Sequence, residues 1–411
     1  MQSSSHRWGP LLRDLFLTAG AIIASIVVLE ISLRLCGVVV TGSLYTTHPT
    51  REFAFRPGAQ AWYTEEGRSF IRINHDGYRD SEHPTAKAAG TVRIAMIGSS
   101  TVAESEVDFA DTATQVLERV LSTRLRAAGR TAEVMNFGVP DYSLAHQYLV
   151  LRDDVRRYRP DIVVVGLSLR NDLFNATRAT KVTHADYPFF VLRDGHPVPD
   201  DMTLRKFNLA SGWHRPVLAD HLKDLMNGWC RLCLIATYAY SLASRALEQD
   251  WHKSPDDRLV FSPPANDDMK MDWQVTDATI EMMRKEAESA GAEFWIVTFD
   301  GGLQASPDLG ERALWQRQMR SDNPFYPDEH FGQIAERHGI PHVILGPLLA
   351  AYTQRTGVSI HGFPNSLPNQ GHLNEAGLRI AGQLIADGLC SGSRLLAMYC
   401  ARPAGETAAS R

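Results

Sequence analysis

The chain alternates between short apolar runs and longer stretches in which apolar residues recur every three or four positions. The apolar runs, which predict strands, cover residues 92–97, 133–137, 161–166, 293–299 and 342–345. The stretches with helical spacing, which predict helices, cover residues 112–128, 144–158, 275–290, 330–338 and 374–389. Strands that alternate with helices predict a mainly parallel sheet with helices on both faces, a flavodoxin-like three-layer α/β/α sandwich.

One long stretch, residues 173–271, interrupts this alternation and contains proline-rich pieces and a helical candidate at 229–247. An interruption of that length inside a compact domain is typical of a functional insertion or lid. We therefore expect residues 91–390 to form one α/β domain that contains this insertion. A linker and N-terminal extension at 41–90 precedes the domain, and a C-terminal tail at 391–411 follows it.

Residues 15–40 form an apolar run of 26 residues whose only charges are Glu30 and Arg34. A helix of this length can span a bilayer. The charge-free part, 15–29, also suits a cleaved signal peptide, and a buried core helix is a third interpretation. We favour a transmembrane anchor, because Glu30 and Arg34 can pair one helical turn apart and no small-residue cleavage site follows.

The orientation of this segment follows from the basic residues beside it. The tail at residues 1–14 carries Arg7 and Arg13, whereas the first basic residue after the run is Arg51. The positive-inside rule therefore favours a cytoplasmic N-terminus and places the rest of the chain outside the cytoplasm, although Arg34 reduces the margin.

Composition and cysteine spacing limit the possible partners. The 411 residues include 42 Lys+Arg and 47 Asp+Glu, a net charge of −5 that gives no field for gathering nucleic acid. Cys230 and Cys233 have the spacing of a redox or half-zinc motif, but no second ligand pair stands out, so we expect no metal. Cys390 and Cys400 could pair in an oxidising compartment, and the sequence leaves their state open.

Four residues with chemical potential lie where loops should meet. Ser100 follows the first predicted strand, Gly138 the second and Asn171 the third, and His372 precedes the last helix. Because the carboxyl ends of parallel strands share one edge of a sheet, we expect these residues to converge there.

Together these residue types suit acyl transfer. A serine hydroxyl needs an imidazole to remove its proton, and donors must be aimed at the oxygen on which negative charge develops. Ser100 is the candidate nucleophile and His372 the candidate base, with the amides of Ser100 and Gly138 and the side chain of Asn171 as oxyanion donors. Taken singly, Ser100 would more often cap a helix, Gly138 would be a turn residue and Asn171 an N-cap, and it is their joint placement after successive strands that favours catalysis.

In these loops the sequence resembles the SGNH (GDSL-type) hydrolase superfamily, whose blocks carry Ser, Gly, Asn and His. The matching blocks are 97–101 (IGSST), 136–143 (NFGVPDYS), 166–172 (GLSLRND) and 372–377 (HLNEAG). In the second block Asp141 stands where a further glycine is common. The resemblance implies the SGNH fold, Ser100 as nucleophile, His372 as base and then acid, and Gly138 and Asn171 in the oxyanion hole, with no cofactor.

One position departs from the family pattern. Members usually carry Asp three residues before the histidine, and this chain has Asn369. Three alternatives stay open: a Ser-His dyad oriented by Asn369, an acid supplied from elsewhere, or loss of activity. Asp300, just after the strand at 293–299, is the substitute acid considered first.

The resemblance also implies a function and a place in the cell. Residues 73–80 (INHDGYRD) and the anchor are similar to a membrane-anchored bacterial subgroup linked to cell-envelope or exopolysaccharide work. We expect a serine ester hydrolase acting on an ester-bearing substrate, an acetylated glycan, from the periplasmic side of the inner membrane. The alternatives are an O-acyltransferase on an extracytoplasmic glycan and a catalytically silent glycan-binding envelope protein.

Overall fold

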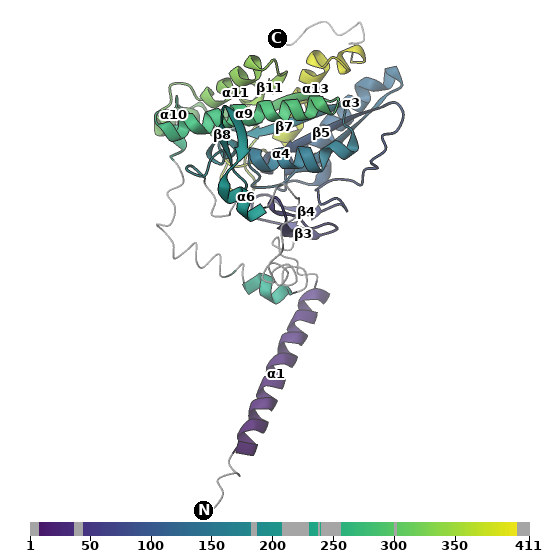
Figure 1. Cartoon of the computed structure of the whole chain (residues 1–411), viewed down its shortest axis with the longest axis vertical. Helices are drawn as coiled ribbons and strands as arrows, with labels where there is room; N and C mark the ends of the chain where they lie inside the picture. The colour runs from purple at the N-terminus through teal and green to yellow at the C-terminus, as the bar shows by residue number, and fades with distance from the viewer. Residues whose placement is uncertain are drawn as a thin grey trace, which may run out of the picture.

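A five-stranded parallel sheet forms the centre of the molecule (Figure 1). The computed structural model describes residues 8–36, 44–181, 187–207, 230–236, 239, 256–299 and 302–400. The strands, in chain order, are β5 (Thr91–Gly98), β6 (Thr131–Gly138), β7 (Ile162–Ser168), β10 (Glu293–Phe299) and β11 (His342–Ile344). Their spatial order is β11-β10-β7-β5-β6, and every neighbouring pair is parallel. Numbered within the sheet this is the flavodoxin-like order 2-1-3-4-5, with its switch point between β5 and β7.

Helices cover both faces of this sheet. One face carries α4 (Leu144–Asp153), α9 (Asp267–Ser289) and α11 (Tyr326–Arg337), and the other carries α3 (Ala113–Leu125), α12 (Leu345–Thr356) and α13 (Glu375–Gly392). Alternate β5 residues face opposite layers, because Ala95 and Ile97 belong to the core under α4, whereas Ile94 and Met96 belong to the core under α3. The predicted three-layer fold with a parallel sheet is confirmed.

Several predicted boundaries change. Helix α9 begins at Asp267 behind the N-cap Asn266, so the predicted insertion 173–271 extends into this helix. Helix α10 (Leu309–Met319) was not predicted, and neither was α12. The predicted tail at 391–411 is wrong at its start, because α13 runs to Gly392 and a 3₁₀ turn, η7 (Leu396–Met398), packs its first residue fully into the core. A disulfide joins Cys390 to Cys400 beside this turn.

The described part of the predicted linker, residues 44–90, is built into the body of the fold. It forms two antiparallel hairpins, β1 (Tyr45–His48) with β2 (Glu52–Phe55) and β3 (Gln60–Tyr63) with β4 (Ser69–Arg72). Phe55 and Ile71 are buried in the core under α4, and the Arg51 guanidinium donates to Asp154 at 2.6 Å. This region is therefore an N-terminal extension fixed to the sandwich.

The described pieces of the insertion also pack on the sandwich. They are α5 (Asn171–Phe174), the hairpin β8 (Phe190–Arg193) with β9 (His196–Pro199), and α6 (Asp201–Phe207). Phe190 packs with Val275 of α9 in a small separate core. Most of the helical candidate at 229–247 lies outside the described residues, although 231–236 is helical.

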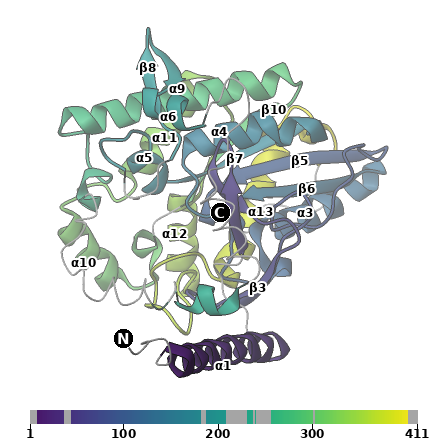
Figure 2. The same cartoon turned by 60° about the horizontal axis from the view of Figure 1, so that its bottom comes forward.

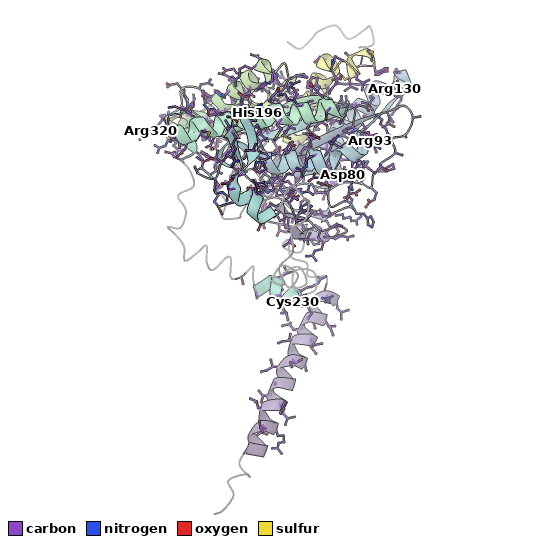
Figure 3. The ribbon with its side chains drawn as sticks, in the orientation of Figure 1. Asp80, Arg93, Arg130, His196, Cys230 and Arg320 are labelled. Atoms are coloured by element: carbon purple, nitrogen blue, oxygen red, sulfur yellow. A yellow bond between two sulfur atoms is a disulfide. The ribbon has the colours of Figure 1, made fainter. Side chains whose placement is uncertain are left out.

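The N-terminal helix α1 (Trp8–Leu35) extends away from the body (Figures 1 and 2). Its segment Leu12–Leu35 is long and apolar enough to cross a membrane. Near its end Glu30 pairs with Arg34 at 2.9 Å and accepts the backbone N–H of Arg231 at 3.2 Å. Figure 3 accordingly places Cys230, which forms a disulfide with Cys233, beside this end of α1.

Candidate active site

Gly98, Gly138 and Gly166 lie side by side at the carboxyl edge of the sheet, and we call this set the glycine floor. Gly98 pairs in register with Gly138 on one side and Gly166 on the other. The short helix α2 (Ser100–Ala103) lies directly on them: a Cβ at Gly138 would be 2.3 Å from the Ala103 amide, and one at Gly98 would be 2.4 Å from Val102. Only glycine fits at these positions, and the floor fixes the helical turn that begins at Ser100.

The hydroxyl of Ser100 lies at this edge and contacts His372. His372 Nε2 is 2.9 Å from Ser100 Oγ, although 272 residues separate them in sequence. Asn374, the N-cap of α13, accepts the amides of Ala376 and Gly377 and so fixes the start of the helix just after His372. The predicted convergence of Ser100 and His372 is thus present in the geometry.

The other ring nitrogen of His372 is held by Glu66, a residue that the sequence analysis did not name. Glu66 Oε2 accepts from His372 Nδ1 at 2.7 Å, and Glu66 Oε1 accepts the backbone N–H of the same histidine at 3.0 Å. The carboxylate therefore fixes both the imidazole and the chain that carries it. Ser100, His372 and Glu66 therefore form one continuous hydrogen-bonded series, hydroxyl to imidazole to carboxylate.

Glu66 lies in the turn between β3 and β4, and this turn is fastened to the loop before His372. Asn365 Oδ1 accepts the Gly67 amide at 2.8 Å, and Asn365 Nδ2 donates to the carbonyls of Gly67 at 3.0 Å and Thr64 at 3.1 Å. Gly67 has φ +69° and lies so close to the Glu106 carbonyl that a Cβ would be 2.3 Å from it. The hairpin tip is thus held in one position against the site.

The loop after α2 is buried and carries two further carboxyl groups. Glu104 and Glu106 are 2% and 3% exposed. The buried guanidinium of Arg79 donates to the backbone carbonyls of Ala103, Glu104 and Val107. Arg79 thereby ties this loop to the N-terminal extension and offsets part of its negative charge.

These carboxyl groups control the protonation of His372. Burial lowers the pKa of its imidazole, but the neighbouring carboxylates of Glu106, Glu66 and Asp141 outweigh this and raise the pKa to about 9. Burial opposes ionisation of Glu66, yet the hydrogen bond from His372 leaves the pKa of Glu66 below its usual range. Burial raises the pKa of Glu106, which lies 3.5 Å from His372 Nδ1. Glu66 is therefore the ionised acid at the imidazole.

Asn369 does not occupy the predicted place beside the imidazole. Its Oδ1 accepts from Ser359 Oγ at 2.6 Å, and its Nδ2 donates to Glu311 at 2.8 Å. With φ 56° it forms part of the turn that leads to His372, and Glu66 holds the Nδ1 position instead. The predicted contact is therefore wrong, and Asp300, the alternative acid, lies outside the described residues.

Gly138 lies at the predicted edge of the sheet but, contrary to our expectation, its N–H is not available to a substrate oxygen. Gly138 N donates to Asn136 Oδ1 at 2.8 Å, so its hydrogen atom is engaged within the protein. In the loop that follows, the Val139 and Tyr142 amides are also bonded, and Pro140 has no N–H. Asp141, with φ 65°, carries the one amide of this loop for which the described chain shows no acceptor. The left-handed conformation accounts for the glycine that is common at this position.

Asn171 opens α5 at the same edge of the sheet. Its neighbour Asp172 is fully buried and accepts the Ser168 amide at 2.7 Å and the Gln147 side chain at 2.8 Å. Burial raises the pKa of Asp172 to about 7. Asp172 thus fixes the turn between β7 and α5 that carries Asn171, and β7 pairs with β5, the strand that leads to Ser100.

Glu66, Glu106 and His372 lie close enough together to be considered as a cation site. Within the described residues, one ligand atom from each of Glu66, Glu106 and His372 lies within 4.8 Å of the others. The histidine atom that faces the carboxylates is Nδ1, which Glu66 already binds. A metal ion would have to replace the Nδ1 proton, so the same three groups fit an acid-supported imidazole without a metal.

Little in the local sequence marks Glu66. The flanking strands β3 and β4 have four residues each, and the glutamate precedes Gly67 in an ordinary turn. The indirect signal was Asn369, since an uncharged residue at the expected acid position indicated that the acid could come from another segment.

Comparisons with known proteins give only distant structural similarities. No family model matches the chain, and no curated protein matches it. A protein described as lipolytic and of the G-D-S-L family from Desulfitobacterium hafniense is 10% identical, with a TM-score of 0.33 over 72% of this chain and 99% of that one. The lipase/acylhydrolase from Enterococcus faecalis is 14% identical, with a TM-score of 0.35 over 73% and 95%. A catalytic mutant of the acetylxylan esterase Axe2 from Geobacillus stearothermophilus is 10% identical, with a TM-score of 0.34 over 73% and 92%. Similarity at this level assigns no activity to the chain.

Proposed function

We propose that the protein is a serine ester hydrolase of the SGNH type that works through an acyl-Ser100 intermediate. The observation that carries this proposal is the continuous series of hydrogen bonds from Ser100 Oγ to His372, at 2.9 Å, and on to Glu66, at 2.7 Å. A serine is a weak nucleophile unless a base removes its proton, and the base needs a partner that fixes its orientation. The serine, the base and the partner of the base are thus supported by one set of contacts, those of Ser100, His372 and Glu66.

The reaction proceeds in two matching halves. Ser100 Oγ attacks the ester carbonyl carbon while its proton passes to His372 Nε2, and Glu66 stabilises the imidazolium through Nδ1–H. The tetrahedral intermediate expels the alcohol, which takes the proton from Nε2, and Ser100 is left acylated. Water then attacks the acyl carbon with the same base, and the acid product leaves with Ser100 restored.

The developing oxyanion needs donors that are not already engaged. We assign this role to the Ser100 amide, the Asn171 side chain and the Asp141 amide, with Asp141 replacing Gly138 because Asn136 accepts the Gly138 amide. Removal of one such donor typically lowers kcat about 10²- to 10³-fold. Asn171→Ala should show a loss of this size, and full activity in that variant would remove Asn171 from the hole.

We also propose a substrate class and a location in the cell. We infer an acylated glycan as the ester, on the resemblance of residues 73–80 and the anchor to the envelope-linked subgroup. Helix α1 anchors the chain in the inner membrane with the body in the periplasm. The disulfides Cys230–Cys233 and Cys390–Cys400 are consistent with an oxidising compartment.

Two alternatives to ester hydrolysis were considered, an O-acyltransferase and a catalytically silent glycan-binding protein. In an O-acyltransferase a sugar hydroxyl replaces water in the second half, and mass analysis of products with glycan acceptors separates the two reactions. A silent glycan-binding protein was suggested by Asn369, and the carboxylate of Glu66 at the imidazole removes that reason.

Labelling with a fluorophosphonate probe tests the proposal directly. We expect the wild-type protein to become labelled at Ser100 and the Ser100→Ala variant to stay unlabelled. Thr101→Ala is a matched control, because it removes a hydroxyl one position away. A folded wild type that neither reacts with the probe nor hydrolyses acetyl esters would contradict the proposal.

A further inference from the structure

The hairpin that carries Glu66 has a second face that the catalytic proposal does not use. Side chains alternate along β3 and β4, so Ala61, Ser69 and Ile71 are buried while Trp62 and Arg72 are exposed. We use the term outer face for the set on the opposite side, which consists of the exposed Gln60, Trp62, Arg68 and Arg72 and the half-buried Phe70.

The outer face combines aromatic rings with arginines. Trp62 is 43% exposed, and its ring packs edge-on against Phe70 with centroids 5.3 Å apart. Arg68 lies over Trp62 at 4.9 Å, and Arg72 lies over Phe70 at 5.6 Å. Neither arginine forms an ion pair with a carboxylate in the described chain. Two guanidinium groups without a carboxylate partner therefore lie over the exposed Trp62 and the half-buried Phe70.

The position of this face matters as much as its composition. The hairpin lies at the end of the body nearest α1 (Figures 1 and 2). Helix α1 ends at Leu35 and β1 begins at Tyr45, so ten peptide steps connect them and can reach at most about 35 Å. The first hairpins are therefore held close to any membrane that α1 spans.

We propose that the outer face binds the anionic phospholipid headgroups of the membrane that α1 enters. Guanidinium groups match phosphate in geometry and charge, tryptophan favours the zone between headgroups and acyl chains, and phenylalanine adds apolar surface that can enter it. The net charge of −5 does not oppose this contact, because surface charges act locally within about 8 Å at physiological salt. The inference rests on the membrane anchoring included in the proposed function.

This contact would connect the membrane surface to the catalytic acid. The same hairpin presents Glu66 to His372 from its tip, where Asn365 holds Gly67. Headgroups bound to Arg68 and Arg72 would fix the hairpin from its opposite side.

The test uses the full chain in nanodiscs of phosphatidylcholine, with or without phosphatidylglycerol, and with brominated acyl chains. Brominated lipid quenches nearby tryptophans, and the difference between wild type and Trp62→Phe isolates the contribution of Trp62. We expect quenching of Trp62 in anionic nanodiscs and little in neutral ones. Each arginine should favour the docked state about fivefold, so the Arg68→Gln/Arg72→Gln variant should lose most of the Trp62 quenching.

The control is Arg355→Gln/Arg379→Gln, which removes the same charge from exposed sites on α12 and α13. Equal quenching of Trp62 in neutral nanodiscs, or an equal loss in this control, would overturn the proposal. A Trp62 response to soluble polygalacturonate with no response to anionic lipid would also overturn it and assign the face to an acidic glycan. Quenching does not depend on catalysis, so docking without esterase activity would leave this inference standing while the proposed function fails.

Discussion

Glu66 Oε2 lies 2.7 Å from His372 Nδ1, although 306 residues separate the two in sequence. Glu66 thus comes from a hairpin that precedes the whole sheet in the chain, whereas Ser100 follows β5 and His372 lies just before α13. The Ser100–His372–Glu66 arrangement depends on tertiary packing rather than on one local motif.

Replacement of Glu66 should therefore reduce catalysis strongly. Glu66→Gln keeps the size of the side chain but removes the charge that stabilises the imidazolium. In serine proteases with a Ser-His-Asp triad, the equivalent Asp→Asn change costs about 10⁴-fold in kcat, and we expect a loss of about 10³- to 10⁴-fold here with a small change in KM. The measurement is steady-state hydrolysis of an acetyl ester, and Glu65→Gln, an exposed neighbour in the same turn, is the control. Near-normal kcat in Glu66→Gln would exclude Glu66 as the catalytic acid.

Activity should rise with pH over a wide range. The carboxylates around His372 raise its pKa to about 9, and the base works only in its neutral form. The profile of kcat/KM should therefore fall as pH decreases below about 9 and level off above it. Glu106→Gln removes one of the carboxyl groups that raise this pKa, so its profile should shift to lower pH. An unshifted profile would mean that Glu106 does not act on the imidazole.

Asn369 should be dispensable for catalysis. Asn369→Gly preserves the left-handed backbone and removes only the bonds to Ser359 and Glu311, so we expect a stability loss of about 1–2 kcal/mol and nearly unchanged kcat. Thermal unfolding and ester hydrolysis measure the two effects separately. A large fall in kcat with intact fold would restore Asn369 as a partner of His372.

The glycine floor gives a steric prediction. Gly138→Ala places a Cβ 2.3 Å from the Ala103 amide, which should displace α2, destabilise the fold by about 1–3 kcal/mol and abolish probe labelling of Ser100. Gly332→Ala in α11 is the matched control, because a Cβ there would be 3.7 Å from its nearest neighbour, Ile344, and alanine favours a helix. Labelling at the wild-type rate in Gly138→Ala would show that the floor does not position the nucleophile.

The sheet was predictable because each strand contains a short, mostly apolar run. The strand at 293–299 has the same limits in the structure, and β5 differs from its prediction by one residue at each end. Helix α12 was missed because it follows β11 at Leu345 with no intervening turn residue. The hairpins β1–β2 and β3–β4 were missed because four-residue strands carry too short a pattern to distinguish from a loop.

The site was predictable only in part, for a similar reason. Ser100 and His372 follow from strand order, since parallel strands deliver their carboxyl ends to one edge. The pairing of His372 with Glu66 depends on how the N-terminal extension folds back, and no local pattern encodes such a contact. The Gly138 amide was assigned from its position, while its actual acceptor, Asn136, became visible only with side chains in place.

The buried guanidinium of Arg79 has a consequence for how the molecule comes apart. Its bonds to Ala103, Glu104 and Val107 fasten the extension to the loop that carries the buried carboxyl groups. Detaching the extension would leave both that cation and those carbonyls without partners, at a cost greater than the separate stability of two small hairpins. The extension and the sandwich should therefore melt in a single cooperative transition, with no stable intermediate in which the sheet persists alone.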